Sequence, residues 1–397
     1  MIVNMYGFEL GREYRLSIAE IYSLFPQMEI VYFDEKILLV DNLDEKKLKD
    51  ISSKLGGTIK IINIENKKYK IQNTEDIYSE MLLSFTDERK NNYAINFYGK
   101  TKFNQKDFLL KAKKYFQKND LSSRFVNQDF QNIKSYLVTK EKLLDHKTDF
   151  NLIFVNDYIY FGNTIFVQDI DSYTKRDFGK TRDMIVGMLP PKLSQIMINL
   201  SNGTTIYDPF CGLGTILLES TISGNEEVYG SDLSIEMVNT TIKNIEFIKN
   251  EFKNNLKKYE VLKLDAKNIG NSPILNNHKI DVIVTEGYLG EILSKLSIDV
   301  DKINKQRQNL SQIYEAFFSG LKKIGFNGNI VISFPFWEIK GKYNYFEEIY
   351  EVINRYCIIL DLLPKNIDLK ASRSGSLMYK RPDQTVGREI FKLKTKK

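Results

Sequence analysis

The segment with the clearest chemical signature is 208–215, Asp-Pro-Phe-Cys-Gly-Leu-Gly-Thr. It follows an apolar run typical of a β-strand and opens a stretch typical of a helix. Glycines at such a turn let the backbone approach a ligand at the carboxyl end of the strand. The third glycine of the dinucleotide-binding pattern is absent. A carboxylate at Asp208 would repel a pyrophosphate, so the segment favours a ligand that carries a positive charge.

Two further acids follow the next two expected strands. Asp232 lies 24 residues after Asp208, where a carboxylate can accept both hydroxyls of a ribose. Asp265, with Ala266 beside it, is placed to accept from the amino group of an adenine. A single acid at a strand end is often only a helix cap. Three acids in register on one sheet edge, with no phosphate site, predict S-adenosylmethionine as the cofactor.

The candidate cofactor-binding residues lie in these three turns. They are Asp208, Phe210, Cys211, Gly212, Gly214, Thr215, Asp232, Leu233, Asp265 and Ala266.

The turn after the fourth expected strand, Glu286-Gly287-Tyr288, is the candidate catalytic site. An exocyclic amine on a base is a poor nucleophile because its lone pair is conjugated into the ring. Oxygens that accept both amine hydrogens direct the lone pair toward an incoming methyl group, and a stacked aromatic ring holds the angle. The carboxylate of Glu286 and the carbonyl of Gly287 are the expected acceptors, and Tyr288 is the expected stacking ring. The alternative is a plain strand-to-loop turn.

Neither cysteine chemistry nor a metal is expected. Methylation of a base at C5 normally uses a cysteine that follows a proline, and no Pro-Cys dipeptide occurs, so Cys211 is interpreted as a small loop residue. Phe336 and Trp337 can line a base pocket, but core packing is the favoured interpretation. Two cysteines and two histidines give neither a disulfide framework nor metal-ligand spacing.

Basic residues are concentrated between positions 100 and 142. This segment has eleven Lys and Arg against four Asp and Glu, a local charge of +7 compared with +6 for the whole chain. Such a concentration suits a phosphate backbone, although a solvated helix face is the simpler explanation. The candidate RNA-binding residues are Lys106, Lys111, Lys113, Lys114, Lys118, Arg124 and Lys134.

The elements that position the acids follow an α/β pattern. A helix is expected from Pro190-Pro191, and strands are expected at 205–207, 228–231, 261–264, 280–285 and 329–334. Strands separated by helices predict a doubly wound, mostly parallel, Rossmann-like sheet. Three further strands, at 356–362, 376–380 and 389–393, lack intervening helices and predict an antiparallel end.

The N-terminal part shows a different order. Strands at 2–8, 28–33, 37–40 and 58–64 and two helices predict a ferredoxin-like β-α-β-β-α-β unit. Its first helix is expected to open with a capping box of Ser17 and Glu20. A second unit is expected to contain a strand at 93–98, a helix at 106–117 and a hairpin of 152–155 with 158–167. The polar stretch 169–188 is expected to be an interdomain linker.

Length and composition set the broad class. The chain has 397 residues, 42% of them hydrophobic and 27% charged, which is typical of an ordinary globular protein of two or three domains. No apolar run approaches the ~20 residues of a membrane span. No secretory signal is visible, so a cytoplasmic, metal-free protein without membrane contact is expected.

In several of the segments described above, the chain resembles the THUMP-domain-containing tRNA guanine-N2 methyltransferases, a family of S-adenosylmethionine-dependent RNA methylases. Segment 208–215 is similar to the family's cofactor loop, segments 173–177 and 188–193 to the approach to that loop, and segment 386–390 to the family's end. The resemblance implies a ferredoxin-like domain at 1–65, a THUMP RNA-binding domain at 66–170 and a methyltransferase domain at 171–397. It further implies that tRNA is the substrate and guanine N2 the methylated atom.

One motif departs from the family. The family's acceptor motif is Asp-Pro-Pro-Tyr, whereas this chain has Glu286-Gly287-Tyr288-Leu289-Gly290. The glutamate keeps an acceptor but is one methylene longer, and Gly287 lacks the fixed φ of a proline. Two alternatives to a tRNA guanine-N2 methyltransferase therefore stay open. One is a methyltransferase for DNA adenine N6 or another nucleobase amine, and the other is a non-catalytic RNA-binding protein with a degenerate methyltransferase domain.

Overall fold

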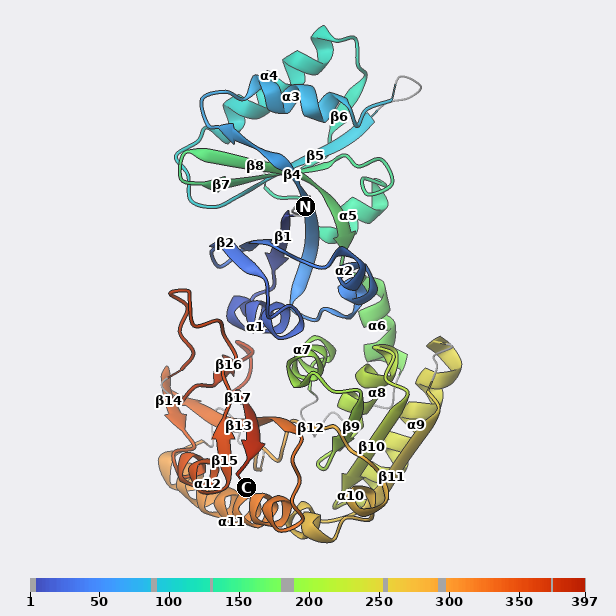
Figure 1. The fold of residues 1–397 in the computed structure, drawn as a ribbon, viewed down its shortest axis with the longest axis vertical. Coiled ribbons are helices and arrows are strands. Elements are labelled where there is room, and N and C mark those ends of the chain that lie inside the picture. The colour runs from blue at the N-terminus through green and yellow to red at the C-terminus, as the bar shows by residue number, and fades with distance from the viewer. Residues whose placement is uncertain are drawn as a thin grey trace. The chain divides into compact units, whose positions relative to one another are not determined.

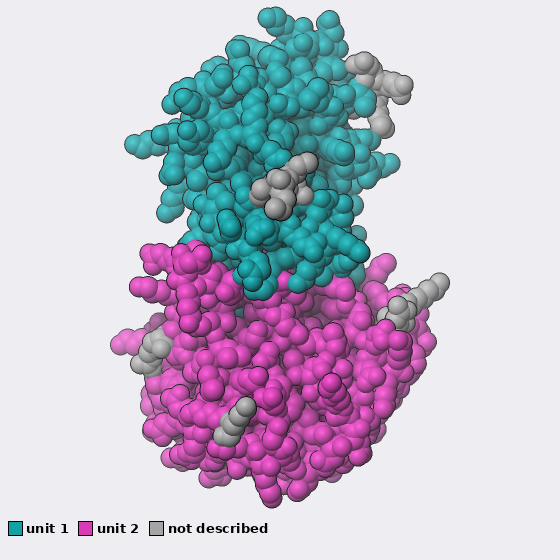
Figure 2. Space-filling model, viewed as in Figure 1, with its two compact units in different colours: residues 1–18, 25–53, 57–172 teal, residues 19–24, 54–56, 173–397 magenta. Residues whose placement is uncertain are grey.

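The computed structural model describes residues 5–86, 91–128, 131–179, 189–252, 256–291, 298–372 and 374–396. The chain divides into two compact units (Figure 2). Unit 1 comprises residues 1–18, 25–53 and 57–172, and unit 2 comprises residues 19–24, 54–56 and 173–397. No helix among the described residues is long and apolar enough to cross a membrane.

The chain begins with the predicted β-α-β-β-α-β order. The elements are β1 (Met5–Leu10), α1 (Tyr14–Leu24), β2 (Glu29–Phe33), β3 (Ile37–Asp41), α2 (Glu45–Ile51), the short 3-10 helix η1 (Ser52–Lys54) and β4 (Thr58–Lys70). Strand β1 pairs antiparallel with β3 and β4, and β2 pairs antiparallel with β3. This gives the strand order β2-β3-β1-β4, as a ferredoxin-like sheet requires.

Strand β4 extends past the expected domain boundary at 65/66. It pairs with β1 through residues 58–64 and with β8 through residues 60–70, so one eight-stranded sheet, β2-β3-β1-β4-β8-β7-β5-β6, runs through unit 1. The remaining elements are α3 (Glu75–Leu82), β5 (Asn91–Tyr98), α4 (Gln105–Lys118), β6 (Ser123–Phe125), α5 (Ser135–Lys140), β7 (Asp149–Val155) and β8 (Tyr158–Val167). The predicted hairpin is β7 with β8. The division of unit 1 into two domains stays a prediction.

One local prediction was wrong, and the expected linker, within which the boundary between the two units falls at 172/173, is partly helical. Helix α1 begins at Tyr14, so Ser17 and Glu20 lie inside the helix instead of forming its capping box. The carboxylate of Glu20 instead accepts from Gly56 N at 2.8 Å. The expected linker contains helix α6 (Ile170–Gly179), where Arg176 is buried and pairs with Glu219 at 3.0 Å. The polar residues 170–179 therefore form a helix in which Arg176 has a buried partner. The rest of the expected linker, positions 180–188, lies outside the described residues.

Unit 2 contains the predicted doubly wound sheet (Figure 1). Strands β11 (Lys258–Lys263), β10 (Glu227–Asp232), β9 (Thr205–Asp208), β12 (Val282–Thr285) and β13 (Asn329–Ile339) are neighbours in that order and pair in parallel. Strand β17 (Val386–Thr395) pairs antiparallel with β13, β15 (Cys357–Ile359) and β16 (Leu377–Tyr379). The mostly parallel sheet with an antiparallel end is thus confirmed.

The helices of unit 2 follow the strands in alternation. They are α7 (Pro191–Ser201), α8 (Thr215–Ile222), α9 (Ile235–Phe252), the 3-10 helix η2 (Ala266–Asn271), α10 (Pro273–Asn277), α11 (Val300–Lys323) and α12 (Glu348–Tyr356), with β14 (Lys342–Tyr345) paired to β13.

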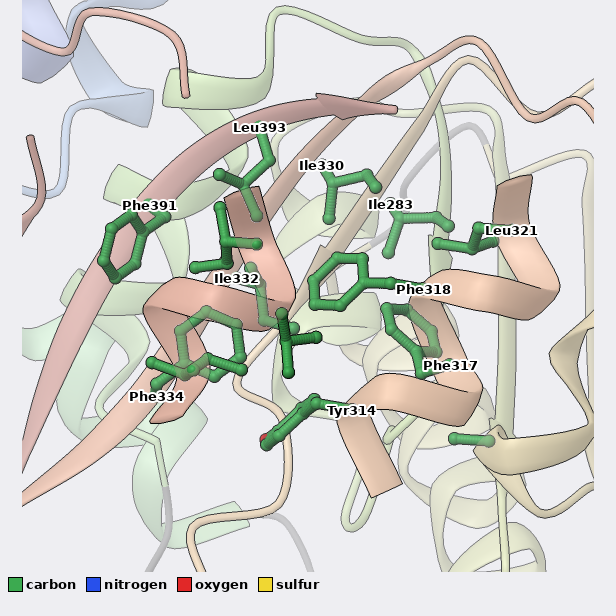
Figure 3. Packing of buried hydrophobic residues seen from close by; sticks show 14 of the residues in the cluster. Ile283, Tyr314, Phe317, Phe318, Leu321, Ile330, Ile332, Phe334, Phe391 and Leu393 are labelled. Carbon is green, nitrogen blue, oxygen red and sulfur yellow. The ribbon is translucent and has the colours of Figure 1, made fainter. Parts of the chain in front are cut away.

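The core of unit 2 forms between α11 and the sheet. Tyr314, Phe317, Phe318 and Leu321 of α11 project from one side at helical spacing, and they meet apolar side chains of β12, β13 and β17 (Figure 3). Trp337 belongs to this core and is fully buried, in agreement with the packing interpretation. The core matters for function because it fixes the strand ends that carry the candidate site.

Candidate active site at the carboxyl edge of the sheet

The glycines of segment 208–215 have the conformations that the motif predicts. The segment connects β9 to α8, and Gly212 and Gly214 have φ values of 50° and 83°. A Cβ at Gly214 would lie 2.8 Å from Thr241 Cγ2, so this position has no room for a side chain. No atom lies within 4 Å of the place that a Cβ would take at Gly212. The loop therefore has open space at Gly212, where a ligand can approach the backbone.

The next strand and helix hold this loop, the helix through side chains and the strand through its backbone. Thr241 and Asn244 on α9 donate to the carbonyls of Gly212 and Leu213, at 2.7 and 3.0 Å. Cys211 N donates to Ser231 O at 3.0 Å. Sequence reasoning missed Thr241 and Asn244. Both are polar residues on the face of α9 that also buries Val238, Ile245 and Ile248, and this position within an apolar face is the signal that could have found them.

The three predicted acids lie at one edge of the sheet. Strand β10 pairs with β9 through Gly230 and Asp208, and its last residue, Asp232, stands opposite Lys263 of β11, two residues before Asp265. Their carboxylates differ in their surroundings. Asp232 accepts from Gly212 N at 2.9 Å and from Ser234 N at 2.8 Å. Asp265 caps η2 by accepting from Lys267 N at 3.0 Å, so the simple helix-cap interpretation also describes it.

Asp208 is the most buried of the three, with 2% exposure. Burial raises the pKa of this carboxyl to about 7, while hydrogen bonds from Thr285 and Phe210 N oppose the shift and the nearby Asp232 and Glu286 carboxylates add to it. Thr285 also accepts from Gly287 N at 3.2 Å. One hydroxyl therefore connects the 208–215 loop to the turn at Glu286.

The segment 286–291, the acceptor loop, is held through its backbone carbonyls. Ser333 donates to Glu286 O at 2.6 Å, Tyr314 to Tyr288 O at 2.8 Å and Gln306 to Glu291 O at 2.9 Å. Gly287 has a φ of 72°, and a Cβ there would lie 2.5 Å from the Tyr314 hydroxyl oxygen. Glycine is therefore required at this position, where the family motif has a proline.

The side chain of Glu286 has a partner that sequence reasoning missed. Arg388 Nε donates to Glu286 Oε1 at 2.5 Å, and Arg388 is only 2% exposed. Among the described residues, none donates to Glu286 Oε2 or to the carbonyl of Gly287. Tyr288 is 43% exposed. The turn therefore presents two unoccupied acceptor oxygens next to an accessible aromatic ring.

Comparison with known proteins agrees with this geometry. Residues 179–297 match the model of a family described as the RMKL-like methyltransferase domain. This match to a methyltransferase model agrees with the cofactor, S-adenosylmethionine, that the acids at the sheet edge predict.

Two curated relatives are similar to part of the chain, and both are named tRNA (guanine(10)-N2)-dimethyltransferase. The protein from Methanothermobacter thermautotrophicus is 32% identical over 123 residues, which is 30% of this chain and 33% of the relative. The protein from Methanocaldococcus jannaschii is 32% identical over 151 residues, 36% of this chain and 41% of the relative. The chain thus matches between a third and two fifths of the length of these relatives. Over these 123 to 151 residues, the similarity agrees with the predicted resemblance to tRNA guanine-N2 methyltransferases.

A solved structure extends the likeness of the fold. The crystal structure of TrmN from Thermus thermophilus aligns with a TM-score of 0.52 at 13% identity and covers 99% of this chain and 100% of its own. This likeness concerns the fold alone. The THUMP domain expected at 66–170 stays a prediction.

The edge of the methyltransferase domain suits an adenosyl ligand by its own chemistry. Leu233, directly after Asp232, is 63% exposed, although it is a large apolar side chain. An apolar side chain beside a fixed carboxylate is the combination that an adenine ring and a ribose require. Ala266 is buried next to Asp265 and leaves little side-chain bulk there. These residues therefore fit the adenosyl part of the cofactor.

Cys211 has no nucleophilic role in this arrangement. It is 5% exposed, and burial raises the pKa of its thiol well above the usual value. Its Sγ lies 3.9 Å from Thr241 Oγ1. The structure therefore agrees with its interpretation as a small loop residue.

All seven candidate RNA-binding side chains are exposed on unit 1. Five lie on α4, whose opposite face buries Phe108, Leu109, Ala112 and Phe116. Lys111 pairs with Asp107 at 2.8 Å and Arg124 with Glu141 at 3.7 Å, and both are surface pairs of little energetic weight. Helix α4 thus presents a basic surface to solvent.

Proposed function

We propose that this chain is an S-adenosylmethionine-dependent tRNA methyltransferase that acts on the exocyclic N2 amine of a guanine. The observation that carries the proposal is the acceptor loop, where Glu286 Oε2 and the carbonyl of Gly287 lack donors among the described residues. An amine with two hydrogens needs two such acceptors. The names of the two curated relatives support guanine N2 as the target.

In this proposal each acid at the sheet edge has a separate task. Asp232, already oriented by Gly212 N and Ser234 N, accepts from the ribose hydroxyls of the cofactor. Asp265 accepts from the adenine amino group, and Leu233 contacts the adenine ring. Asp208 is buried behind the loop and provides negative charge toward the positive end of the ligand. The bound cofactor supplies an electrophilic methyl group.

The acceptor loop prepares the nucleophile. Hydrogen bonds from the amine to Glu286 Oε2 and Gly287 O turn the nitrogen lone pair out of conjugation, and the Tyr288 ring stacks on the base. The nitrogen loses one proton when its new bond to carbon forms, and Oε2 is the proposed acceptor of that proton. The base must leave its stack to reach the loop. Neither a covalent enzyme intermediate nor a metal is part of this proposal.

Unit 1 is proposed to bind the RNA. The basic surface of α4, together with Arg124 and Lys134, is suited to phosphates, and the expected ferredoxin-like and THUMP domains would hold the tRNA for the methyltransferase domain.

The proposal is tested by incubating the purified chain with S-adenosylmethionine and unmodified tRNA transcripts, then digesting the RNA to nucleosides for mass spectrometry. We expect N2-methylguanosine or its dimethyl form, and none with the Asp232→Ala variant. N6-methyladenosine as the product, or methylation of DNA and not RNA, would identify the alternative nucleobase methyltransferase. Cofactor binding without methylation of any transcript would identify a non-catalytic RNA-binding protein.

A further inference from the structure

The ion pair between Glu286 and Arg388 restricts what the acceptor loop can bind. Arg388 lies on β17 opposite Pro335 of β13. Its Nε donates to Glu286 Oε1 at 2.5 Å, and its Nη1 donates to Gln384 Oε1 at 3.3 Å. Removing the carboxylate from a buried guanidinium strongly destabilises the folded protein, because a buried charge is left without a partner. Oε1 is therefore committed to Arg388, and only Oε2 remains for a substrate.

The other charged and titratable groups near Glu286 are consistent with the pairing of Oε1 with Arg388. Asp208 interacts unfavourably with Glu286 across the sheet edge, and the buried Tyr314 hydroxyl also lies within electrostatic range. Tyr314 is directed to the carbonyl of Tyr288. Of these groups only Arg388 is cationic. Arg388 therefore fixes which oxygen of Glu286 faces outward.

The two oxygens of the turn to which no described residue donates, Glu286 Oε2 and the carbonyl oxygen of Gly287, are both acceptors. An ion-paired carboxylate offers lone pairs only, and so does the carbonyl of Gly287. Guanine presents N1–H beside its N2 amine, and Oε2 can accept from N1–H as well as from the neighbouring amine hydrogen because it has more than one lone pair. Adenine presents the N1 lone pair beside its N6 amine. Two facing lone pairs repel, so an acceptor-only site disfavours the adenine edge.

We infer that Arg388 is a positioning residue and that the Glu286–Arg388 pair selects a purine whose exocyclic amine lies next to a ring N–H. The inference rests on the proposed function and deepens it, because it assigns the choice of guanine to one ion pair.

The first experiment changes the substrate and not the protein. The guanine that the mass spectrometry identifies is replaced in a synthetic tRNA by 2-aminopurine, which keeps the 2-amino group but has a lone pair at N1. We expect methyl transfer to fall by about tenfold to hundredfold, the range for one good bidentate contact. Equal rates on guanine and 2-aminopurine would overturn the inference and leave the proposed function standing. No transfer to guanine would overturn the proposed function itself.

The second experiment uses Glu286→Gln. Arg388 donates to the amide oxygen and thereby turns the NH₂ group outward, so the turn now presents a donor. We expect the guanine to 2-aminopurine rate ratio to fall by at least about tenfold, because the donor matches the N1 lone pair of 2-aminopurine. A purely structural pair would lower both rates equally, and an unchanged ratio would therefore contradict the inference.

Variants of Arg388 complete the test. Arg388→Gln is expected to lower kcat for guanine by about a hundredfold with little change in cofactor affinity, since the carboxylate is no longer oriented. Arg388→Lys keeps the charge and should recover part of the rate. Arg355→Gln, which removes the exposed ion pair with Glu315, is the matched control and should change nothing. Full activity of Arg388→Gln on guanine, with the ratio preserved, would overturn the inference.

Discussion

At the scale of single residues, the account depends on carboxylates with different surroundings. Asp232 has both oxygens engaged by backbone N–H groups, Asp208 is buried with a raised pKa, and Glu286 is paired with Arg388. Their distinct surroundings imply distinct tasks, because hydrogen bonds favour the charged form of a carboxylate and burial opposes it.

Asp232→Ala is expected to lower the affinity for S-adenosylmethionine by at least about a hundredfold. The variant removes charge-assisted hydrogen bonds to the ribose and releases Gly212 N. Isothermal titration calorimetry measures the affinity. Asp361→Ala, which removes an exposed carboxylate paired with Lys365, is the control and should bind normally. Normal binding by Asp232→Ala would remove the ribose contact from the account.

Asp208 should couple cofactor binding to proton release. Its pKa of about 7 leaves it largely protonated at pH 6.5, and a nearby cationic ligand favours the ionised form. The binding heat at pH 6.5 should therefore depend on the ionisation enthalpy of the buffer. This dependence should be lost in Asp208→Asn at the same pH, where the amino group of the ligand is already protonated. Buffer-independent heats of the wild-type chain at pH 6.5 would contradict the assignment.

At the scale of elements, two loops at neighbouring strand ends act together. The 208–215 loop and the acceptor loop share the Thr285 hydroxyl, and α9, α11 and β13 hold their carbonyls. The loops themselves are thus positioned by residues far away in the sequence.

Gly287→Ala is expected to lower turnover by about a hundredfold while cofactor affinity is retained. The added Cβ meets the Tyr314 hydroxyl and moves the acceptor carbonyl by a fraction of an ångström or more. Gly341→Ala is the matched control, because Gly341 has a φ of 76° but nothing within 4 Å of its Cβ position. The control should lose about 1 kcal/mol of stability and no turnover. Equal turnover of Gly287→Ala and wild type would show that the acceptor loop tolerates displacement.

The alternation of strands and helices in unit 2 could be predicted from the sequence because apolar runs and turn residues are local signals. The three acids could be placed because parallel strands end at one edge. Arg388, Thr241 and Asn244 could not be found in this way, since their partners lie 102, 29 and 31 residues away. Helix α6 was missed for the same reason. Its sequence has no clear apolar periodicity, and its Arg176 pairs with Glu219, which lies far away in the sequence.

At the scale of the whole molecule, the charge is concentrated in unit 1 and the candidate chemistry in unit 2. The chain's net charge of +6 is smaller than the +7 of segment 100–142 alone, so the remainder is close to neutral. RNA affinity should therefore depend on the basic surface and on salt.

The double variant Lys113→Ala/Lys114→Ala is expected to weaken tRNA binding and to make the slope of log K against log salt shallower by about 1 to 2. Each lost phosphate contact reduces the number of counterions that are released on binding. Fluorescence anisotropy at several salt concentrations measures the slope. Lys322→Ala/Lys323→Ala, an exposed pair at the end of α11, is the control and should leave the slope unchanged. If both variants behave alike, α4 does not bind the RNA.

The most direct test of the central claim is mass spectrometry of nucleosides from the total tRNA of cells with and without this gene. We predict that deletion removes an N2-methylated guanosine, and that the wild-type gene restores it while the Asp232→Ala gene does not. An unchanged nucleoside profile after deletion would contradict the claim that this sheet edge binds a methyl donor for tRNA guanine.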